Sequence, residues 1–158
     1  MESILKISDL SIGDWVKAQD SELPYQIYLI DWQSGTIEAQ ATNGALLDEM
    51  VCDIRPIPIT AEILEKSGFK RSDDYDGTER TPYLFRKGEK KSPYDKVTVN
   101  IHHPTKKTPK RMFKNGIYHE LVYESPAIAN TWTFVFVRYV HELQHALRLA
   151  GIDKEILP

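Results

Sequence analysis

The sequence predicts an α+β protein whose strands are all antiparallel. Short strand-like runs separated by tight-turn residues occur in both halves of the chain, whereas helical signals are confined to one segment in the middle and one at the end. The length of 158 residues suits one domain or two very small ones. We expect a small β-barrel-like or meander unit of the SH3-like kind over residues 1–59. Residues 60–158 should form an α+β unit with a short helix and a second antiparallel sheet packed by a C-terminal helix.

The N-terminal unit should contain four short strands. Each predicted strand combines β-branched, aromatic or aliphatic residues and is bounded by turn residues. Asn43-Gly44 is the clearest turn, because both residue types tolerate a positive φ. Pro56 and Pro58 then end the sheet, because proline cannot donate a hydrogen bond within a central ladder. The predicted strands cover residues 14–18, 26–32, 36–41 and 50–54.

The second unit should begin with a short helix. Thr60 suits the N-cap, Glu62 lies in the first turn, and Gly68 can end the helix, with Phe69 placed to pack back on it. A polar loop is expected over residues 70–81. Further strands are expected over residues 83–86, 96–102 and 117–123.

The last helix is predicted to end at Gly151. Its start is ambiguous, because residues 131–137 are rich in aromatic and β-branched types. One apolar stripe at helical spacing is the predicted core face, and it comprises Phe136, Val140, Leu143, Leu147 and Ala150. His141 and His145 fall on the opposite side of the helical wheel and are therefore expected to face water.

Residues His141 to His145 also spell H-E-x-x-H, a pattern typical of zinc hydrolases. Two imidazoles four residues apart share one helix face and can both bind one Zn²⁺, while Glu142 between them can act as general base on a metal-bound water. A catalytic zinc also needs a third protein ligand. His102, His103 and His119 are upstream candidates, and their spacing selects none of them.

Composition favours a cytoplasmic protein. Apolar residues make up 41% and charged residues 27% of the chain, no apolar run is long enough to span a membrane, and no secretory signal is recognised at the start. Cys52 is the only cysteine and can form no internal disulfide. Charge is uneven: residues 1–69 contain 12 acidic and 4 basic residues, whereas residues 70–158 contain 11 and 16. This asymmetry indicates two functional halves or a basic surface for an anionic partner.

Basic residues concentrate in region 86–114. A cluster beside Phe113 and Tyr118 comprises Lys106, Lys107, Lys110, Arg111 and Lys114. Basic loops with neighbouring aromatics suit phosphate contacts and base stacking, so nucleic-acid binding is one interpretation. A solvated loop is the other, because net charge is −3 and no named nucleic-acid motif occurs.

Three blocks of the sequence, Leu10–Val16, Ile54–Phe69 and Tyr139–Gln144, resemble a family of gut Bacteroidales proteins of unknown function that often occur among phage-like or mobile-element genes. The resemblance implies a small β unit, a short helix, a second antiparallel sheet and a C-terminal helix, and it implies no activity. It also implies that the position of His145 is commonly Asn in this family, so that the completed H-E-x-x-H pattern is incidental.

Our leading hypothesis is therefore a non-enzymatic binding or adaptor protein of mobile-element origin, without a cofactor. Its partner would be a protein, or nucleic acid bound through the basic region, and no membrane is involved. The alternative is a zinc-dependent hydrolase with His141 and His145 as metal ligands and Glu142 as general base.

Overall fold

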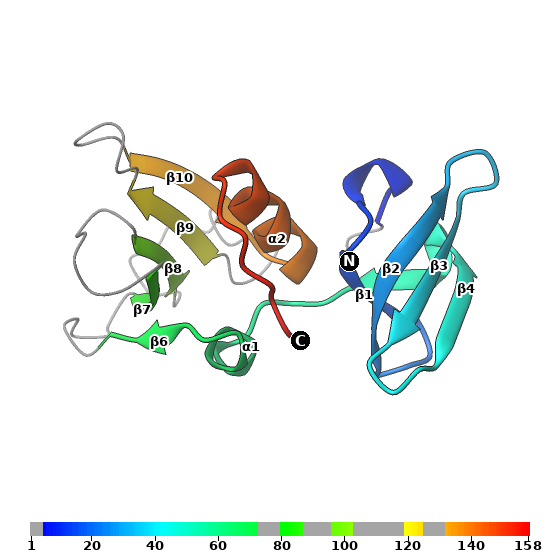
Figure 1. Cartoon of the computed structure of the whole chain (residues 1–158), viewed down its shortest axis with the longest axis horizontal. Helices are drawn as coiled ribbons and strands as arrows, with labels where there is room; N and C mark the ends of the chain where they lie inside the picture. Colours follow the sequence, from blue (N-terminus) through cyan, green and yellow to red (C-terminus); the bar gives the residue numbers. More distant parts are fainter. Residues whose placement is uncertain (1–4, 73–79, 87–95, 103–118, 125–131) are drawn as a thin grey trace, which may run out of the picture.

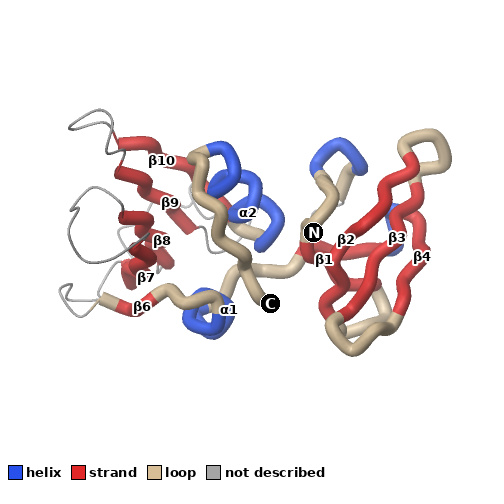
Figure 2. Tube along the Cα trace, viewed as in Figure 1, coloured by secondary structure: helices blue, strands red, loops and turns tan. Residues whose placement is uncertain are grey.

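The computed structural model describes residues 5–72, 80–86, 96–102, 119–124 and 132–158, and within these residues the chain is an α+β protein (Figure 1). It has two antiparallel sheets and two α-helices in this described part, α1 (Ala61–Lys66) and α2 (Val140–Leu149). Figure 2 shows the two sheets at opposite ends of the molecule, with both α-helices beside the second sheet. No helix within the described ranges has the length and apolar character that crossing a bilayer requires.

The first sheet is an open antiparallel meander with the strand order β4-β3-β2-β1-β5. Its strands are β1 (Trp15–Ala18), β2 (Pro24–Asp31), β3 (Thr36–Ala41), β4 (Leu46–Met50) and β5 (Ile54–Pro56). A 3-10 turn, η1 (Ile7–Asp9), precedes β1, and a second, η2 (Val51–Asp53), joins β4 to β5. Strands β4 and β5 form the two edges, so the sheet is not a closed barrel within the described residues.

The first three predicted strands are confirmed, and the fourth, expected over residues 50–54, is wrong. Gly44 has a φ of 86°, and its N–H donates to the Ala41 carbonyl at 2.9 Å. Because this turn is tight, pairing resumes at Leu46, opposite Gln40. The returning strand therefore ends at Met50, and η2 takes up the next residues.

Strand alternation places one face of the first sheet in a core. Ile37, Ala39 and Ala41 on β3 are buried. Gln40, which lies between Ala39 and Ala41, has its side chain exposed on the opposite face. The buried cluster comprises Leu5, Leu10, Val16, Tyr25, Ile27, Ile37, Ala39, Ala41, Leu47 and Ile54. The opposite face of β2, β3 and β4 is left for solvent or for a partner.

The second sheet is also an antiparallel meander, with the order β10-β9-β8-β7-β6. Its strands are β6 (Lys70–Arg71), β7 (Arg80–Arg86), β8 (Lys96–His102), β9 (His119–Glu124) and β10 (Trp132–Val137). One expectation is wrong: the loop expected over residues 70–81 contains β6 and the first residues of β7. The run that left the start of the last helix ambiguous is strand β10 at residues 132–137, paired with β9. Residues 73–79 lie outside the described residues.

Helix α1 begins and ends as predicted. The Thr60 hydroxyl accepts a hydrogen bond from the Ile63 N–H at 3.2 Å, which caps the first turn. Gly68 follows the helix with a φ of 83°, and the Phe69 N–H donates to the Leu64 carbonyl at 2.9 Å. This Schellman arrangement turns the Phe69 ring back into the core, where it is buried.

Helix α2 ends by the same motif, with Gly151 at a φ of 70° and the Ile152 N–H donating to the Leu147 carbonyl at 2.9 Å. The predicted core residues Val140, Leu143 and Leu147 are all fully buried. Two members of the predicted stripe are not in the helix: Phe136 belongs to β10 and is 64% exposed, and Ala150 is the C-cap residue.

Backbone hydrogen bonds between distant segments of the chain also connect the two sheets. The segment after β5 pairs with the segment before α2: the Val140 N–H donates to the Ile57 carbonyl at 2.9 Å, and the Ile59 N–H donates to the Arg138 carbonyl at 3.0 Å. The Trp15 side chain, at the start of β1, is buried in the second unit's core cluster. Consequently, α2 lies where the two units meet (Figure 1).

Candidate functional site

The H-E-x-x-H segment lies at the junction of the two units. His141 is 3% exposed and Gln144 is 4% exposed, so the expectation that the histidine face meets water is wrong for His141. The side chain of His145 is also largely covered, with 31% exposed. The physical reason is that α2 is covered on both sides: one face packs on the second core, and residues just before β1 cover part of the other.

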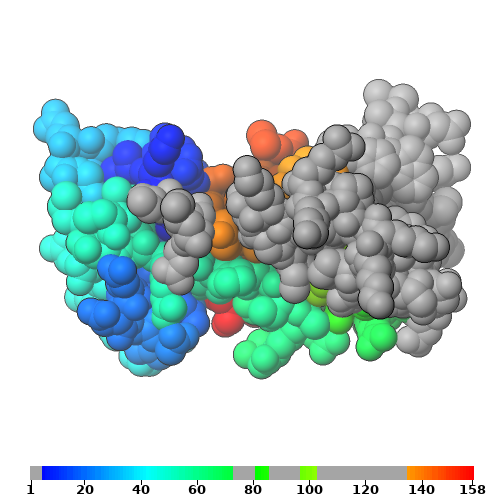
Figure 3. All heavy atoms as spheres, turned by 180° about the vertical axis from the view of Figure 1, so that it is seen from behind, coloured from blue at the N-terminus to red at the C-terminus, as the bar shows by residue number. Residues whose placement is uncertain are grey.

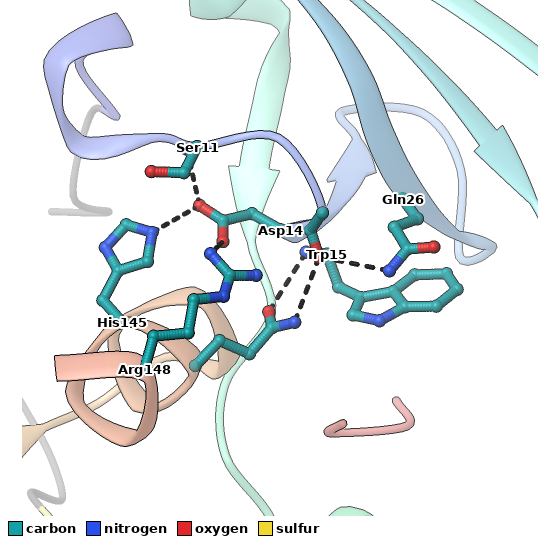
Figure 4. Close-up of polar contacts among 8 residues, drawn as sticks. Ser11, Asp14, Trp15, Gln26, His145 and Arg148 are labelled. Carbon is teal, nitrogen blue, oxygen red and sulfur yellow. Dashed lines mark hydrogen bonds and ion pairs between the residues drawn. The ribbon is translucent and has the colours of Figure 1, made fainter. Parts of the chain in front are cut away.

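Asp14 is the centre of this junction. Its side chain is completely buried, and Oδ2 accepts a hydrogen bond from the Ser11 N–H at 2.8 Å. Nε2 of His145 lies 2.8 Å from the same oxygen, and Nη1 of Arg148 lies 3.2 Å from Oδ1 (Figure 4). A buried carboxylate is costly unless it is paired and hydrogen-bonded, and here α2 supplies both side-chain partners.

Gln144 attaches the same helix to the backbone before β1. Its Nε2 donates to the Gly13 carbonyl at 3.1 Å, and its Oε1 lies 3.4 Å from the Trp15 N–H. Gln26 on β2 donates to the same Gly13 carbonyl at 3.2 Å. Gly13 itself has a φ of 89°, and a Cβ atom there would lie 3.2 Å from Nη2 of Arg148. Glycine therefore suits the backbone conformation at this position, and a Cβ atom would also require the Arg148 side chain to shift by a few tenths of an ångström.

Glu142 acts as a helix cap in this structure. Its Oε2 accepts hydrogen bonds from the Arg138 N–H at 2.6 Å and from the Tyr139 N–H at 3.2 Å. These bonds satisfy backbone donors ahead of the first turn, and an acidic side chain there is favoured by the helix dipole. The carboxylate proposed as a general base is thus turned toward the start of its own helix.

His141 has the most unusual environment of the junction. Its ring stacks on Tyr139, with centroids 5.9 Å apart, and meets the His145 ring edge-on at 6.1 Å. Within the described residues, its buried Nδ1 has no hydrogen-bond partner. Burial lowers the pKa of His141 below its ordinary value of 6.5, more than the neighbouring carboxylates of Glu142 and Asp14 raise it.

The fold places the rings of His141 and His145 next to each other, but both rings make contacts other than metal coordination. A carboxylate can only accept, so the Asp14 contact requires a proton on Nε2 of His145, which removes that lone pair from metal binding. No group of three or more His, Cys, Asp or Glu side chains that could hold a metal ion occurs in the part of the chain that is described. Of the upstream candidates, His102 ends β8 and His119 begins β9, while His103 lies outside the described residues.

The predicted nucleic-acid residues cannot be placed in this fold. All five, namely Lys106, Lys107, Lys110, Arg111 and Lys114, lie outside the described residues.

A second candidate surface, which sequence reasoning missed, lies on the opposite side of the first sheet. Five large hydrophobic side chains on and between β2 and β4 are exposed, namely Tyr28, Leu29, Trp32, Leu46 and Met50. Together with the outward acids Glu38 and Asp48 we call them the β2–β4 outer face. In Figure 3 the cyan and teal surface of this part of the chain is at the end of the molecule away from the second sheet.

Strand register shows that these side chains are neighbours. Leu29 pairs with Glu38, and Glu38 pairs with Asp48, so the three form one row across β2, β3 and β4. The β-bulge between Ile27 and Leu29 turns Tyr28 outward, and its hydroxyl donates to Oε2 of Glu38 at 2.9 Å. This hydrogen bond raises the pKa of the Tyr28 hydroxyl.

The turn between β2 and β3 lies next to the end of β4. Trp32 is 60% exposed at the start of the turn. A Cβ atom on Gly35, at the end of the turn, would lie 3.9 Å from Cε of Met50, so the Met50 side chain reaches across from β4 to the same turn. A signal for this face was present in the sequence: residues 18–54 contain no Lys, Arg or His.

Comparisons with known proteins add no further assignment. No family model matches the sequence, and neither the curated proteins nor the solved structures contain a match.

Proposed function

We propose that the chain is a non-enzymatic binding or adaptor protein that docks a protein partner on the β2–β4 outer face. The observation that carries this proposal is the group of five exposed large hydrophobic side chains on β2, on β4 and in the turn between β2 and β3. Exposed large hydrophobic side chains that gather in one part of a protein surface often mark an interaction site, and aromatic residues and methionine are enriched in protein interfaces.

The connectivity of the first sheet supports the same proposal. The order β4-β3-β2-β1-β5, with a 3-10 turn just before the last strand, is the order of SH3-like modules, although this sheet is open. SH3 domains bind proline-rich extended segments in grooves lined by aromatic side chains. Tyr28 and Trp32 are aromatic residues of this sheet that remain exposed.

The bonding of the H-E-x-x-H segment supports a non-enzymatic function. In a zinc hydrolase, Glu142 would have to break its hydrogen bonds to two backbone N–H groups. His145 would have to break its contact with the fully buried carboxylate of Asp14. Each departure would leave groups without the partners that now satisfy them. Nucleic-acid binding through region 86–114 is the other alternative, and it rests on sequence alone.

A selection from a random peptide display library tests the proposal. Wild-type protein is the bait, and selected peptides are then measured against Trp32→Ser and against Leu149→Ser. Leu149 is 90% exposed at the end of α2, outside the β2–β4 outer face, so its variant is a matched control for lost apolar surface. We expect peptides whose affinity falls at least tenfold with Trp32→Ser and is unchanged with Leu149→Ser. Peptides that bind all three proteins equally would overturn the proposal.

A further inference from the structure

The β2–β4 outer face is acidic as well as apolar. Between residues 18 and 54 the chain has no cationic side chain, and its acids there are Asp20, Glu22, Asp31, Glu38, Asp48, Glu49 and Asp53. Glu22 is neutralised by ion pairs to Lys17 and Arg55 near the other edge of the sheet. Within the described residues, no cation lies within ion-pair distance of Glu38 or Asp48. Glu38 accepts a hydrogen bond from the neutral Tyr28 hydroxyl, which leaves the charge of its carboxylate uncompensated.

One acid lies between two apolar side chains along the edge strand. Met50, Asp48 and Leu46 occupy every second position of β4, and all three are exposed on the same face. Side chains at every second position of a strand are about 6.6 Å apart. The face therefore presents an apolar, an acidic and an apolar position in a line, with Glu38 beside Asp48 on β3.

An extended peptide has the same repeat. If it lies along β4, the side chains on its facing side recur at every second residue and can match this line one by one. The complementary pattern is apolar, basic, apolar at alternate positions, and it reads the same in either direction. A lysine or arginine at the central position would lie opposite two carboxylates, while an acidic residue would meet them with like charge.

We propose that the partner is a cationic protein segment that binds in extended conformation and carries the pattern apolar-x-basic-x-apolar. This inference rests on the proposed function, and it adds the chemistry of the partner. Nucleic acid is disfavoured at this face, because phosphates would be repelled by Glu38 and Asp48. The same repulsion applies to an anionic lipid surface.

Fluorescence anisotropy with defined synthetic peptides tests the inference. The probes share a Gly-Ser flank on each side of three different cores: Leu-Thr-Arg-Thr-Leu, Leu-Thr-Glu-Thr-Leu and Ser-Thr-Arg-Thr-Ser. Each is titrated with wild-type protein, with Glu38→Gln/Asp48→Asn and with the control Asp153→Asn/Glu155→Gln. The control removes the same charge from exposed residues beyond α2. Circular dichroism verifies that all variants fold.

We expect the Leu-Thr-Arg-Thr-Leu probe to bind wild type at least fivefold more tightly than either other probe. Glu38→Gln/Asp48→Asn should remove most of the preference for Arg over Glu, the control should keep it, and raising NaCl from about 50 to about 300 mM should weaken binding. If wild type binds the Arg and Glu probes with equal affinity and the Leu46→Ser variant binds neither, the inference is overturned and the proposed function stands. If no probe distinguishes wild type from Leu46→Ser, both are overturned. Face-dependent binding of a single-stranded DNA oligonucleotide would also overturn the inference.

Discussion

Nε2 of His145 and Oδ2 of Asp14 lie 2.8 Å apart, although the two residues belong to opposite ends of the chain. Asp14 comes from the turn before the first sheet and is fully buried, and His145 comes from the closing helix. The contact therefore ties α2 to the N-terminal unit. It also gives the second histidine of the H-E-x-x-H pattern a structural role that the pattern itself does not suggest.

The first prediction concerns this buried carboxylate. Asp14→Asn keeps the shape of the side chain but removes the charge that faces His145 and Arg148. Because charge-assisted hydrogen bonds contribute about 1.5–3 kcal/mol each, we expect the free energy of unfolding to fall by about 2–3 kcal/mol. Urea unfolding followed by tryptophan fluorescence measures this change. Asp20→Asn, at an exposed acid, is the control, and equal stability of the two variants would contradict the role of Asp14.

The second prediction concerns pH. Burial lowers the pKa of His141 in the folded protein below 6.5, so the unfolded state takes up a proton there first as pH falls. The contribution of His141 to stability is therefore complete above pH 6.5 and is lost as pH falls from 6.5 through the lower pKa of the folded state. Urea unfolding at a series of pH values should show this decrease for wild type and a smaller one for His141→Leu. Identical pH dependence in the two proteins would rule the explanation out.

The third prediction concerns the close approach at Gly13. Gly13 and Gly44 have nearly the same φ, 89° and 86°, but only at Gly13 would a Cβ atom meet a neighbour, Nη2 of Arg148 at 3.2 Å. Both alanine variants should lose about 1 kcal/mol from backbone strain. Gly13→Ala should lose more than Gly44→Ala, because the Arg148 side chain must also shift by a few tenths of an ångström where it bonds to Asp14. Thermal unfolding of both variants measures the difference in their loss of stability. Equal losses would show that the contact between position 13 and Arg148 does not affect stability.

The fourth prediction separates capping from catalysis at Glu142. Glu142→Ala leaves the Arg138 and Tyr139 N–H groups without their acceptor, so the free energy of unfolding should fall by about 1 kcal/mol. Glu155→Ala, an exposed acid beyond α2, is the matched control and should be nearly neutral. Chemical denaturation measures both variants. A Glu142→Ala protein as stable as wild type would mean that the carboxylate is free for another function.

Local signals were sufficient to predict α1 and the ends of both helices. Thr60, Gly68 and Gly151 determine caps through bonds to residues only three to five positions away, so neighbouring residues contain the information. The same holds for the turn at Asn43-Gly44, which predicts that a hairpin exists. Where the returning strand ends depends on pairing with β3, and the strand expected over 50–54 was misplaced for that reason.

The environment of His141 and His145 could not be predicted from helix periodicity. A wheel identifies one apolar face and assigns the remainder to solvent, which fails when a second unit covers the polar side. The partners that cover it, Gly13 and Asp14, lie about 130 residues earlier in the chain. The β2–β4 outer face was missed for a related reason: Leu46 and Met50 are recognisable as outward only after the register of β4 is known.

The central claim is that the H-E-x-x-H helix joins the two sheets through His145 and Gln144. Isothermal titration of untagged protein with Zn²⁺ at neutral pH, for wild type and for His145→Asn, tests it most directly. We expect no zinc binding by wild type that is tighter than binding by His145→Asn. One equivalent of Zn²⁺ bound by wild type at least tenfold more tightly than by the variant would contradict the account and favour the hydrolase.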